Sequence, residues 1–288
     1  MGDPEQFLSE RRLLFAIAYR MLGSAADADD VLQDAFLRWA EYGKPVDSPR
    51  SFLTTTVVRL CLDQLGSARA RRVDYVGPWL PEPLLANDAG PAETAELADS
   101  LSMAFLVLLE ELAPAERAAF LLHDVFGYGY HEIAAMLGRR EPAARQLIAR
   151  ARHRIGERRH RFDANPRHGR QLASQFLTAC ATGDLQALMS LLADDIVVWT
   201  DGGGKARAAR NPIYGARKAA RFLIGTAKDV PASADISLAC LNGQPGAIIT
   251  ESGRVRAAIV LDILQHHVTG VRIIVNPDKL SRLQASRS

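Results

Sequence analysis

Cysteine is scarce in this chain, and the three cysteines, Cys61, Cys180 and Cys240, are far apart and odd in number. They form neither a CxxC metal pair nor a disulfide framework, and a reducing compartment is the simplest interpretation. No stretch reaches the length of a membrane span, and the N-terminal MGDPEQFLSE lacks the basic and apolar regions of a signal peptide. We therefore expect a cytoplasmic protein with no membrane partner and no metal.

Lysine is also scarce, since five of the 35 basic residues are Lys and 30 are Arg. Arginine richness is thus partly a habit of the whole chain. The formal net charge is only +2, so a strongly basic segment is a local feature and not a consequence of a basic protein. With 288 residues, 48% of them hydrophobic, the chain is long enough for two or three globular domains, each with its own core.

The segment from Pro114 to Ile155 has the pattern of a helix-turn-helix. A first helix is followed by a short helix at residues 131–137, a turn at 138–141 and a longer helix with Pro142 at its first position, where a missing N–H costs nothing. One apolar stripe recurs at helical spacing on the longer helix and comprises Ala144, Leu147, Ile148, Ala151 and Ile155.

The opposite face of that helix, together with the turn before it, has side chains suited to DNA. These are Arg140, Arg145, Gln146, Arg150 and His153. Arg and Gln read base edges in the major groove, and the small Ala149 permits a close approach of the backbone. Residues 139–161 hold nine Arg and two acids. A helix that only faces solvent is the alternative, but this local excess beside a turn of the right length favours nucleic-acid binding.

Composition and periodicity divide the rest of the chain. Residues 1–72 show helical stripes and form an all-helical domain, and residues 73–92, which contain GPWLPEP, form a linker. Residues 93–161 are helical again, with Phe105, Leu108, Leu109 and Leu112 on the first stripe. Residues 168–284 predict an α+β domain with a mostly antiparallel sheet. Its expected helices lie at 171–183 and 185–192, and its expected strands at 196–200, 236–241, 247–250, 255–264 and 270–275.

Several segments carry a resemblance to a known family. DADDVLQDAFLRW, SPRSFLTTTVVRLCLDQLGSARARR and the helix-turn-helix resemble regions two and four of extracytoplasmic-function (ECF) RNA polymerase sigma factors, over nearly all of the first 160 residues. WLPEP in the linker, then DGGGK and NPDKL, are similar to the subgroup with a SnoaL-like C-terminal domain. Three such motifs in order, attached to both sigma regions, are specific. The resemblance implies a multidomain fold, in which two all-α sigma domains precede an α+β cone-like SnoaL domain.

The resemblance also implies roles for individual residues. The protein would be a transcription initiation factor without a cofactor, whose partners are promoter DNA and core RNA polymerase through its β′ clamp and β flap. The clamp-binding helix would present Asp30, Gln33, Asp34, Arg38 and Trp39, although acids are also ordinary first-turn residues. The segment that opens the −10 element would use Thr54, Thr55, Arg59, Arg69, Arg71 and Arg72. Many members have Trp and Asn where Phe52 and Arg59 stand, so the base-holding side chain is left open. The helix-turn-helix would read the −35 element.

The three pentapeptides are expected to form a contact that regulates the sigma domains in cis. The contact would comprise Trp79, Leu80, Pro81, Glu82, Pro83, Asp201, Gly202, Gly203, Gly204, Lys205, Asn276, Pro277, Asp278, Lys279 and Leu280. Consecutive glycines permit left-handed backbone and close approach of another chain. Glu82 and Asp278 are candidate partners of Lys205, Arg207 or Arg210. The alternatives are a flexible hairpin turn for DGGGK and a stiff linker for WLPEP.

The C-terminal domain leaves other function classes open. Cone-shaped α+β domains include isomerases and cyclases, which place an acid or base in an apolar cavity, and Asp201, Tyr214, Asp262 and His266 are the candidates here. None has a spacing that demands catalysis, so we favour a regulatory domain that is a candidate to hold a small-molecule ligand. A ligand-sensing repressor is the other rival, but a repressor needs no single-strand-capturing domain at residues 1–72.

Overall fold

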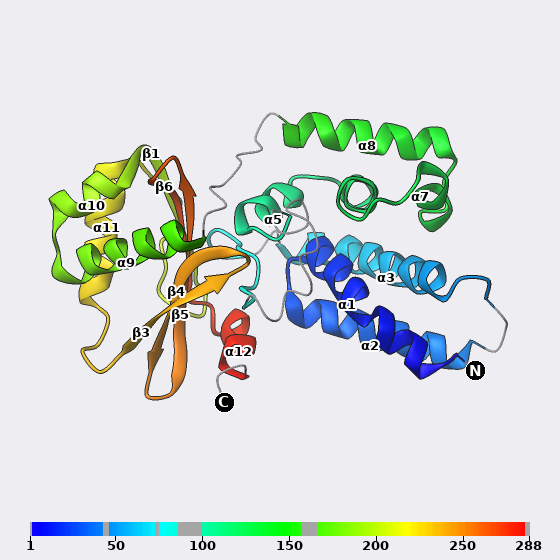
Figure 1. Ribbon diagram of the computed structural model, residues 1–288, viewed down its shortest axis with the longest axis horizontal. Helices are drawn as coiled ribbons and strands as arrows, with labels where there is room; N and C mark the ends of the chain where they lie inside the picture. The colour runs from blue at the N-terminus through cyan, green and yellow to red at the C-terminus, as the bar shows by residue number, and fades with distance from the viewer. Residues whose placement is uncertain (1, 43–45, 73–74, 86–99, 157–165, 286–288) are drawn as a thin grey trace. The chain divides into compact units, whose positions relative to one another are not determined.

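The computed structural model describes residues 2–42, 46–72, 75–85, 100–156 and 166–285 (Figure 1). The chain divides into two compact units. The first unit comprises residues 1–74, 89–101 and 105–159, and the second comprises residues 75–88, 102–104 and 160–288. The linker residues 75–85 therefore belong to the same unit as the C-terminal domain, and so do the first two residues of the helix that begins at Met103.

Three helices form the N-terminal part of the first unit: α1 (Pro4–Leu22), α2 (Ala25–Glu41) and α3 (Pro49–Arg72). Each begins where the sequence supplies a side-chain cap, because Asp3, Ser24 and Ser48 accept hydrogen bonds from first-turn N–H groups at 2.9, 3.2 and 3.2 Å. Gly23, with φ of 69°, ends α1 in the left-handed conformation that glycine adopts without strain. Helix α1 packs against both α2 and α3.

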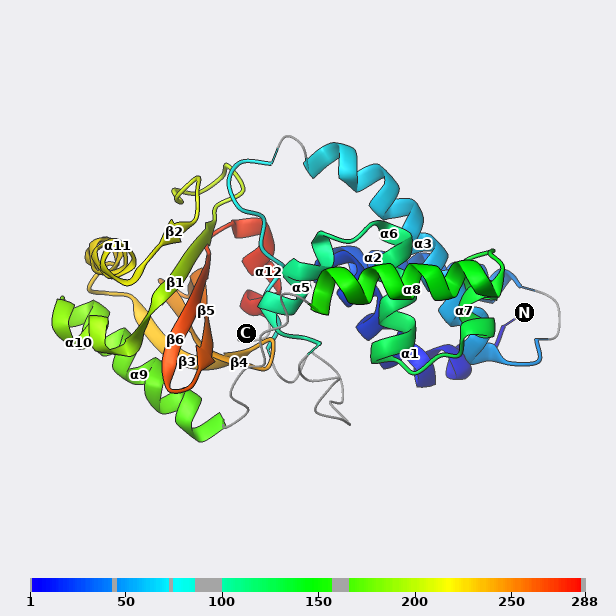
Figure 2. The ribbon, with the colours of Figure 1, turned by 90° about the horizontal axis from the view of Figure 1, so that it is seen from above.

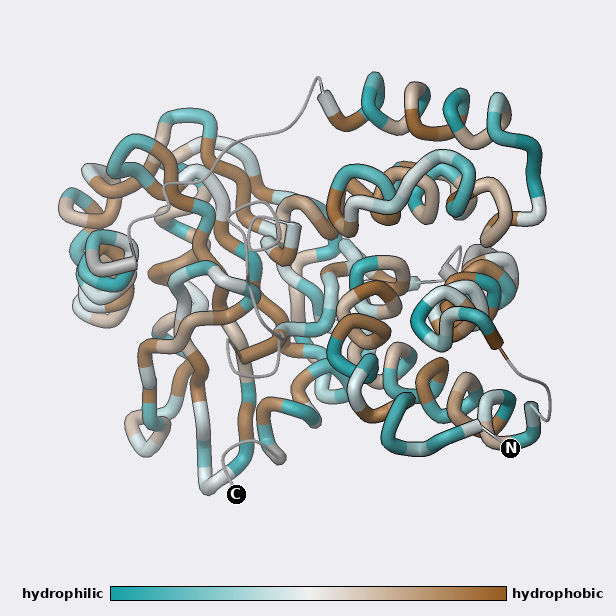
Figure 3. The backbone as a smooth tube through the Cα atoms, turned by 45° about the vertical axis from the view of Figure 1, so that its right-hand side comes forward, coloured by the Kyte–Doolittle hydropathy of each residue, from teal (hydrophilic) through white to brown (hydrophobic). Residues whose placement is uncertain are grey.

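The rest of the first unit contains the helix-turn-helix. Its elements are α5 (Met103–Glu110), α6 (Pro114–Phe120), the π-helical turn η1 (Leu121–Val125), α7 (Tyr130–Met136) and α8 (Glu141–Gly156). Gly138, with φ of 62°, turns the chain after α7, and the Arg139 N–H donates to the Ala134 carbonyl at 2.8 Å. The expected apolar stripe of α8 is buried, and α8 packs on α6 and α7. Figure 3 shows the matching alternation of hydrophobic and hydrophilic turns along the helices.

The second unit is built on a six-stranded sheet with strand order β2-β1-β6-β5-β4-β3. All neighbouring strands pair antiparallel except β1 and β6, which run parallel. The strands are β1 (Leu192–Asp201), β2 (Ile213–Tyr214), β3 (Asp235–Leu241), β4 (Gln244–Glu251), β5 (Arg254–Leu264) and β6 (His267–Ile274). Left-handed residues Ser252 and Gly253 make the β4–β5 turn that the sequence predicts.

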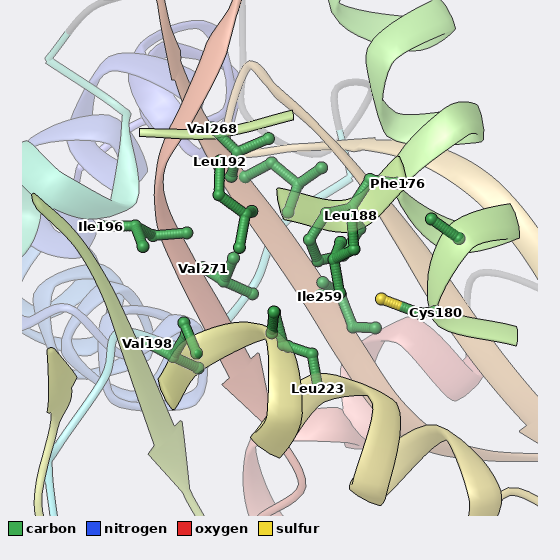
Figure 4. Close-up of a cluster of buried hydrophobic side chains, with 14 of the residues drawn as sticks. Phe176, Cys180, Leu188, Leu192, Ile196, Val198, Leu223, Ile259, Val268 and Val271 are labelled. Carbon is green, nitrogen blue, oxygen red and sulfur yellow. The ribbon is translucent and has the colours of Figure 1, made fainter. Parts of the chain in front are cut away.

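Three helices cover one face of this sheet: α9 (Pro166–Thr182), α10 (Leu185–Leu191) and α11 (Ala216–Lys228). Their apolar sides meet alternate strand residues in one core, which includes Phe176, Leu188, Leu223, Ile196 and Val198 (Figure 4). On β5 the core takes Ala257, Ile259, Leu261 and Ile263, every second residue, so the residues between them face the other side of the sheet.

The other face is covered by the linker and by the last helix, α12 (Pro277–Ala285), which contacts β5 (Figure 2). Leu80 and Leu84 of the linker and Leu280 and Leu283 of α12 are each at most 3% exposed. The Leu84 N–H donates to Asn242 Oδ1 at 2.9 Å, and the Asn242 N–H donates to the Leu84 carbonyl at 2.8 Å. The linker has no regular element between Tyr75 and Leu84, as expected, but it is fixed on the sheet domain.

The expected α+β domain is confirmed, and three of its elements were absent from the sequence prediction. These are the short strand β2 and the helices α11 and α12. Among the described residues, no helix combines the length and the apolarity that crossing a membrane requires.

Candidate functional site

The exposed face of α8 has the composition expected of a DNA-reading surface. Arg140, Arg145, Gln146, Arg150 and His153 are all exposed, and so is Ala149 between them. The buried stripe on the opposite side fixes the rotation of the helix, because Leu147 and Ile148 are at most 6% exposed. These polar side chains therefore share one solvent-facing surface that is compatible with entry into a major groove.

Acidic side chains hold several of these arginines. Arg145 donates to Glu141 at 2.7 Å, one turn earlier in α8, and its guanidinium lies 4.0 Å from the centroid of the Tyr130 ring. Arg150 and Arg154 both donate to Glu116 of α6, each at 2.9 Å. These contacts set the positions of the long side chains, yet the arginine side chains remain about half exposed. The Arg145–Glu141 pair is exposed on both sides and can exchange for a phosphate or base contact at small cost, since exposed ion pairs contribute about 0–1 kcal/mol, whereas Glu116 is 7% exposed and needs at least one of its arginines.

Helix α2 presents the residues expected to face the polymerase, with one exception. Asp30, Gln33, Asp34 and Arg38 are exposed. Trp39 is only 3% exposed, donates from Nε1 to the Asp3 carbonyl at 2.8 Å, and packs against Phe52 with ring centroids 5.6 Å apart. Trp39 is thus a core residue. The surface of α2 expected to face the polymerase is therefore limited to the exposed side chains of Asp30, Gln33, Asp34 and Arg38.

The helix expected to open the −10 element is engaged by the helix-turn-helix. The Thr54 hydroxyl is 3.1 Å from the Tyr128 hydroxyl, and Thr55 donates to the Ser51 carbonyl within α3. Arg59 donates to the Met136 and Ala135 carbonyls at 3.2 and 3.4 Å, at the C-terminal end of α7. A guanidinium at a helix C-terminus is favourable because the last carbonyls lack intrahelical partners. Arg69, Arg71 and Arg72 lie on the last turn of α3, but their side chains are outside the described residues.

Asp201 is the centre of the contact between the three pentapeptides. It is fully buried at the end of β1, and its carboxylate accepts the Tyr75 hydroxyl at 2.5 Å, the Leu80 N–H at 2.8 Å and Lys279 Nζ at 2.6 Å. Lys279 also donates to the Leu80 carbonyl at 2.5 Å and lies over the Trp79 ring, 4.4 Å from its centroid. Burial and the Asp201 carboxylate raise the pKa of Tyr75, so the phenol is the proton donor.

Asn276 and the glycines complete this contact. Asn276 Nδ2 is 3.1 Å from the Tyr75 hydroxyl, and the N–H groups of Val275 and Asn276 both donate to the Asp201 carbonyl. A Cβ on Gly203, whose φ is 57°, would lie 2.3 Å from Asn276 Nδ2. Only glycine fits there. The DGGGK segment is therefore a close-packed turn rather than a loose one.

Lys205 pairs with Asp278 at 2.5 Å, one of the two acids expected for it. Both side chains are more than half exposed, so this pair is a surface contact at the rim. Glu82, the other expected acid, is 3% exposed, and Arg207 faces Asp229 at 3.7 Å. The motif therefore contains two Lys–Asp pairs of similar length, one buried and one exposed.

The four acid–base candidates lie in different surroundings. Asp201 is bound as described, and Asp262 accepts from Gln244 Nε2 at 2.6 Å and from the buried Arg272. Tyr214 is 65% exposed on the edge strand β2. His266 Nδ1 lies 2.5 Å from His168 Nε2 at the surface. Among the described residues, no three His, Cys, Asp or Glu side chains cluster so as to hold a metal ion.

Sequence reasoning missed several residues of the contact. Tyr75 precedes WLPEP and reads as an ordinary linker aromatic, and Asn242 sits before Gly243 where a hairpin turn explains it. Gln244 begins β4 and is 4% exposed, although Gly243 and Pro245 on either side of it favour a turn in the sequence. A polar residue in a predicted turn gives no signal of burial, so only the folded chain shows these roles.

Comparison with known proteins identifies the class. Residues 7–71 match the family model for sigma-70 region 2, and residues 102–155 match the model for sigma-70 region 4. These ranges contain α1–α3 and the helix-turn-helix, so the first unit has the two regions of a sigma factor.

Full-length relatives narrow the class to one family. The ECF RNA polymerase sigma factor SigJ of Mycobacterium tuberculosis is 38% identical over 251 residues, 85% of this chain and 80% of the relative. The probable ECF sigma factor SigI of the same species is 30% identical over 282 residues, 96% of this chain and 94% of the relative. The crystal structure of SigJ matches with a TM-score of 0.76 at 32% identity, over 97% of this chain and 98% of that chain. The chain belongs to the ECF RNA polymerase sigma factors, which direct transcription initiation.

Proposed function

We propose that this chain binds core RNA polymerase through the exposed polar face of α2, reads the −35 element with α8 and holds the −10 element with α3 and its exit. The support is the side chains that each helix presents to solvent. Acids and Arg38 line α2, and a helix face of Arg145, Gln146 and Arg150 fits direct readout of bases. No covalent chemistry is part of this proposed role.

Base readout by α8 is tested by two substitutions and a control. Arg145→Ala and Gln146→Ala should each lower discrimination at one −35 position by about 1–3 kcal/mol in polymerase-bound form. Arg139→Ala, in the turn before α8, is the control, and it should weaken binding to all sequences evenly with a smaller salt dependence. Binding to a library of −35 variants, measured at two salt concentrations, distinguishes the two behaviours. Equal effects of all three would contradict this orientation of α8.

The free protein is proposed to rest in a form that binds promoter DNA weakly. Arg59 and Thr54 of α3 are engaged by the α7 carbonyls and by Tyr128, so contacts to the −10 element require these bonds to open. Gel-shift titrations of the free protein and of the polymerase complex on one promoter test this. Tight, sequence-specific binding by the free chain would instead favour a repressor.

We propose further that the C-terminal domain regulates initiation in cis by holding the linker. The main support for this proposal is the buried carboxylate of Asp201. It binds the linker through Tyr75 and Leu80, and it binds α12 through Lys279. The linker joins the two sigma regions, so its docking limits the separations that they adopt. Release of the linker shifts the population among arrangements of the two sigma regions and thereby changes the fraction of chains that the polymerase can bind.

The two Lys–Asp pairs provide a matched test of this regulation. Lys279→Met removes the buried pair, whereas Lys205→Met removes the exposed pair of the same chemistry. Run-off transcription with core polymerase should change several-fold with Lys279→Met and little with Lys205→Met. A chain truncated before Asn276 also lacks Lys279, so its activity should change in the same direction as that of Lys279→Met. Equal activity of all variants, at unchanged stability of residues 1–160, would reject regulation through this contact.

A further inference from the structure

A hollow of about 610 Å³ lies on the second unit, on the face of the sheet away from α9 and α11. Its floor includes Val197 and Trp199 of β1, whose neighbours Ile196 and Val198 point into the helix-side core. Strand residues alternate between faces, so the hollow is distinct from the space between the sheet and its helices. A volume of this size suits a small organic molecule.

A chain of buried polar side chains forms one wall. Gln244, Asp262 and Arg272 are each at most 5% exposed, and Asp262 joins the other two by accepting a hydrogen bond from each. The Arg272 guanidinium also lies over the Trp199 ring, 4.6 Å from its centroid. Asp262, Arg272 and Trp199 all line the hollow.

Arg272 has an unused donor in this wall. Its Nε is buried and has no hydrogen-bond partner among the described residues. Buried donors are almost always bonded, so this N–H points to an acceptor that the described residues do not supply, which a small shift of the lining Arg272 side chain would bring to the hollow. The acceptor that fits a guanidinium N–H is a carbonyl or carboxylate oxygen.

The charges around the hollow select between these two acceptors. Asp262 already neutralises Arg272, and two further carboxylates, Asp194 and Asp195, stand exposed at the rim. The lining is therefore acidic overall and repels an anion. Rim carboxylates accept N–H groups, while Leu192, Val197 and Trp199 offer apolar contact.

We propose that this hollow binds an uncharged, flat small molecule whose edge carries a carbonyl oxygen beside an N–H donor, as in an aromatic carboxamide. The carbonyl accepts from Arg272, the N–H donates to a rim carboxylate, and the ring packs on the apolar floor. Gln244 Oε1 also accepts the Met103 N–H at 2.7 Å, and Met103 belongs to the second unit. Control of initiation by such a ligand would rest on the proposed function, whereas binding itself does not.

Three matched probes test the ligand class on the full chain without polymerase: benzamide, benzoate and benzylamine. The protein contains three Trp residues, so labelling with 5-fluorotryptophan gives three ¹⁹F signals, assigned by Trp→Phe variants. Benzamide should shift the Trp199 signal saturably and leave those of Trp39 and Trp79 in place. Its dissociation constant should be at least about fivefold below that of benzoate, which the acidic lining repels, and below that of benzylamine, whose ammonium group must lose its hydration and offers no acceptor to Arg272.

Two variants sharpen the test. Ala193→Phe fills the hollow without adding a ¹⁹F signal and should abolish the benzamide shift. The double change Asp194→Asn with Asp195→Asn alters only exposed side chains and should raise the affinity for benzoate relative to benzylamine by several-fold. No Trp199 shift with any probe, equal or tighter binding of either charged probe, or a shift that persists in Ala193→Phe would each overturn the proposal. None of these results bears on the Asp201 contact, so the two proposals fail separately.

Discussion

Replacing Lys279 by Met should release the linker from the C-terminal domain. The substitution keeps the length and the apolar stem of the side chain but removes the ammonium group, which donates to Asp201 at 2.6 Å and to the Leu80 carbonyl at 2.5 Å. Asp201 is 0% exposed and the Lys279 side chain 12% exposed, so water cannot replace the lost charge without local opening.

The expected cost follows from burial. Removing one partner of a buried ion pair destabilises by about 3–5 kcal/mol, because the other charge is left buried. The Tyr75 hydroxyl and the Leu80 N–H still bind the Asp201 carboxylate, so we expect the lower end, about 3 kcal/mol. That corresponds to about a 100-fold increase in the open population of the linker. Lys205→Met removes a pair whose side chains are 56% and 61% exposed, and it should cost at most about 1 kcal/mol.

Amide hydrogen exchange measures this opening residue by residue. The Leu80 and Leu84 N–H groups are bound by Asp201 and Asn242 across the linker contact, so both should exchange about 100-fold faster in Lys279→Met. Exchange of the α1 amides in the first unit is the internal control and should not change. Equal acceleration by Lys279→Met and Lys205→Met, or none by either, would refute the assignment of the buried pair as the one that holds the linker.

Three further outcomes are expected. Gly203→Ala, at a left-handed position crowded by Asn276, should lower the free energy of unfolding by more than about 1 kcal/mol and with it the melting temperature. Gly225→Ala, in α11 with no atom within 4 Å of the new Cβ, should raise the free energy of unfolding by up to about 1 kcal/mol. Changes of the same sign in the two variants would argue against the tight turn. The pKa of Tyr75 is raised in the folded state, so Tyr75 stabilises the folded protein fully at pH values below its ordinary pKa of about 10. This stabilisation is lost as the pH rises through the raised pKa of the folded state. Urea unfolding should show that alkaline loss, and Tyr75→Phe should flatten it. A thiol reagent should modify the exposed Cys240 in the folded protein, though slowly because burial raises the pKa of this thiol, and the two buried thiols only on unfolding.

Elements with strong periodic signals were predictable from the sequence. The apolar stripe of α8 is a local feature of the sequence, and it is buried as expected. Helix α11 was missed although its faces differ clearly, because its buried side is mostly alanine, which is a weaker apolar signal than leucine or isoleucine, and Gly225 interrupts the pattern. Helix α12 was hidden inside the NPDKL motif. Its start signals were present, with Pro277 in the first turn and Asp278 beside it.

The partners within the regulatory contact were only partly predictable. The sequence offered Glu82 and Asp278 for Lys205, and charge alone cannot choose between them. In the fold, the adjacent residues Asp278 and Lys279 diverge by the roughly 100° step of a helix. Asp278 consequently stays at the surface with Lys205, and Lys279 reaches the buried Asp201. Such a division depends on the rotation of α12 against the sheet, which no short motif encodes.

The linker contact also has a consequence for synthesis on the ribosome. Tyr75 and Leu80 leave the ribosome long before their partners Asp201 and Lys279, because about 200 residues separate Leu80 from Lys279. At roughly 5–20 residues per second, both sigma regions are complete for about 6–24 s before Lys279 is added. During that interval the linker has no docking surface. The docking of the linker is therefore the last restraint to form. A nascent chain, or one whose translation stops early, has both sigma regions without it.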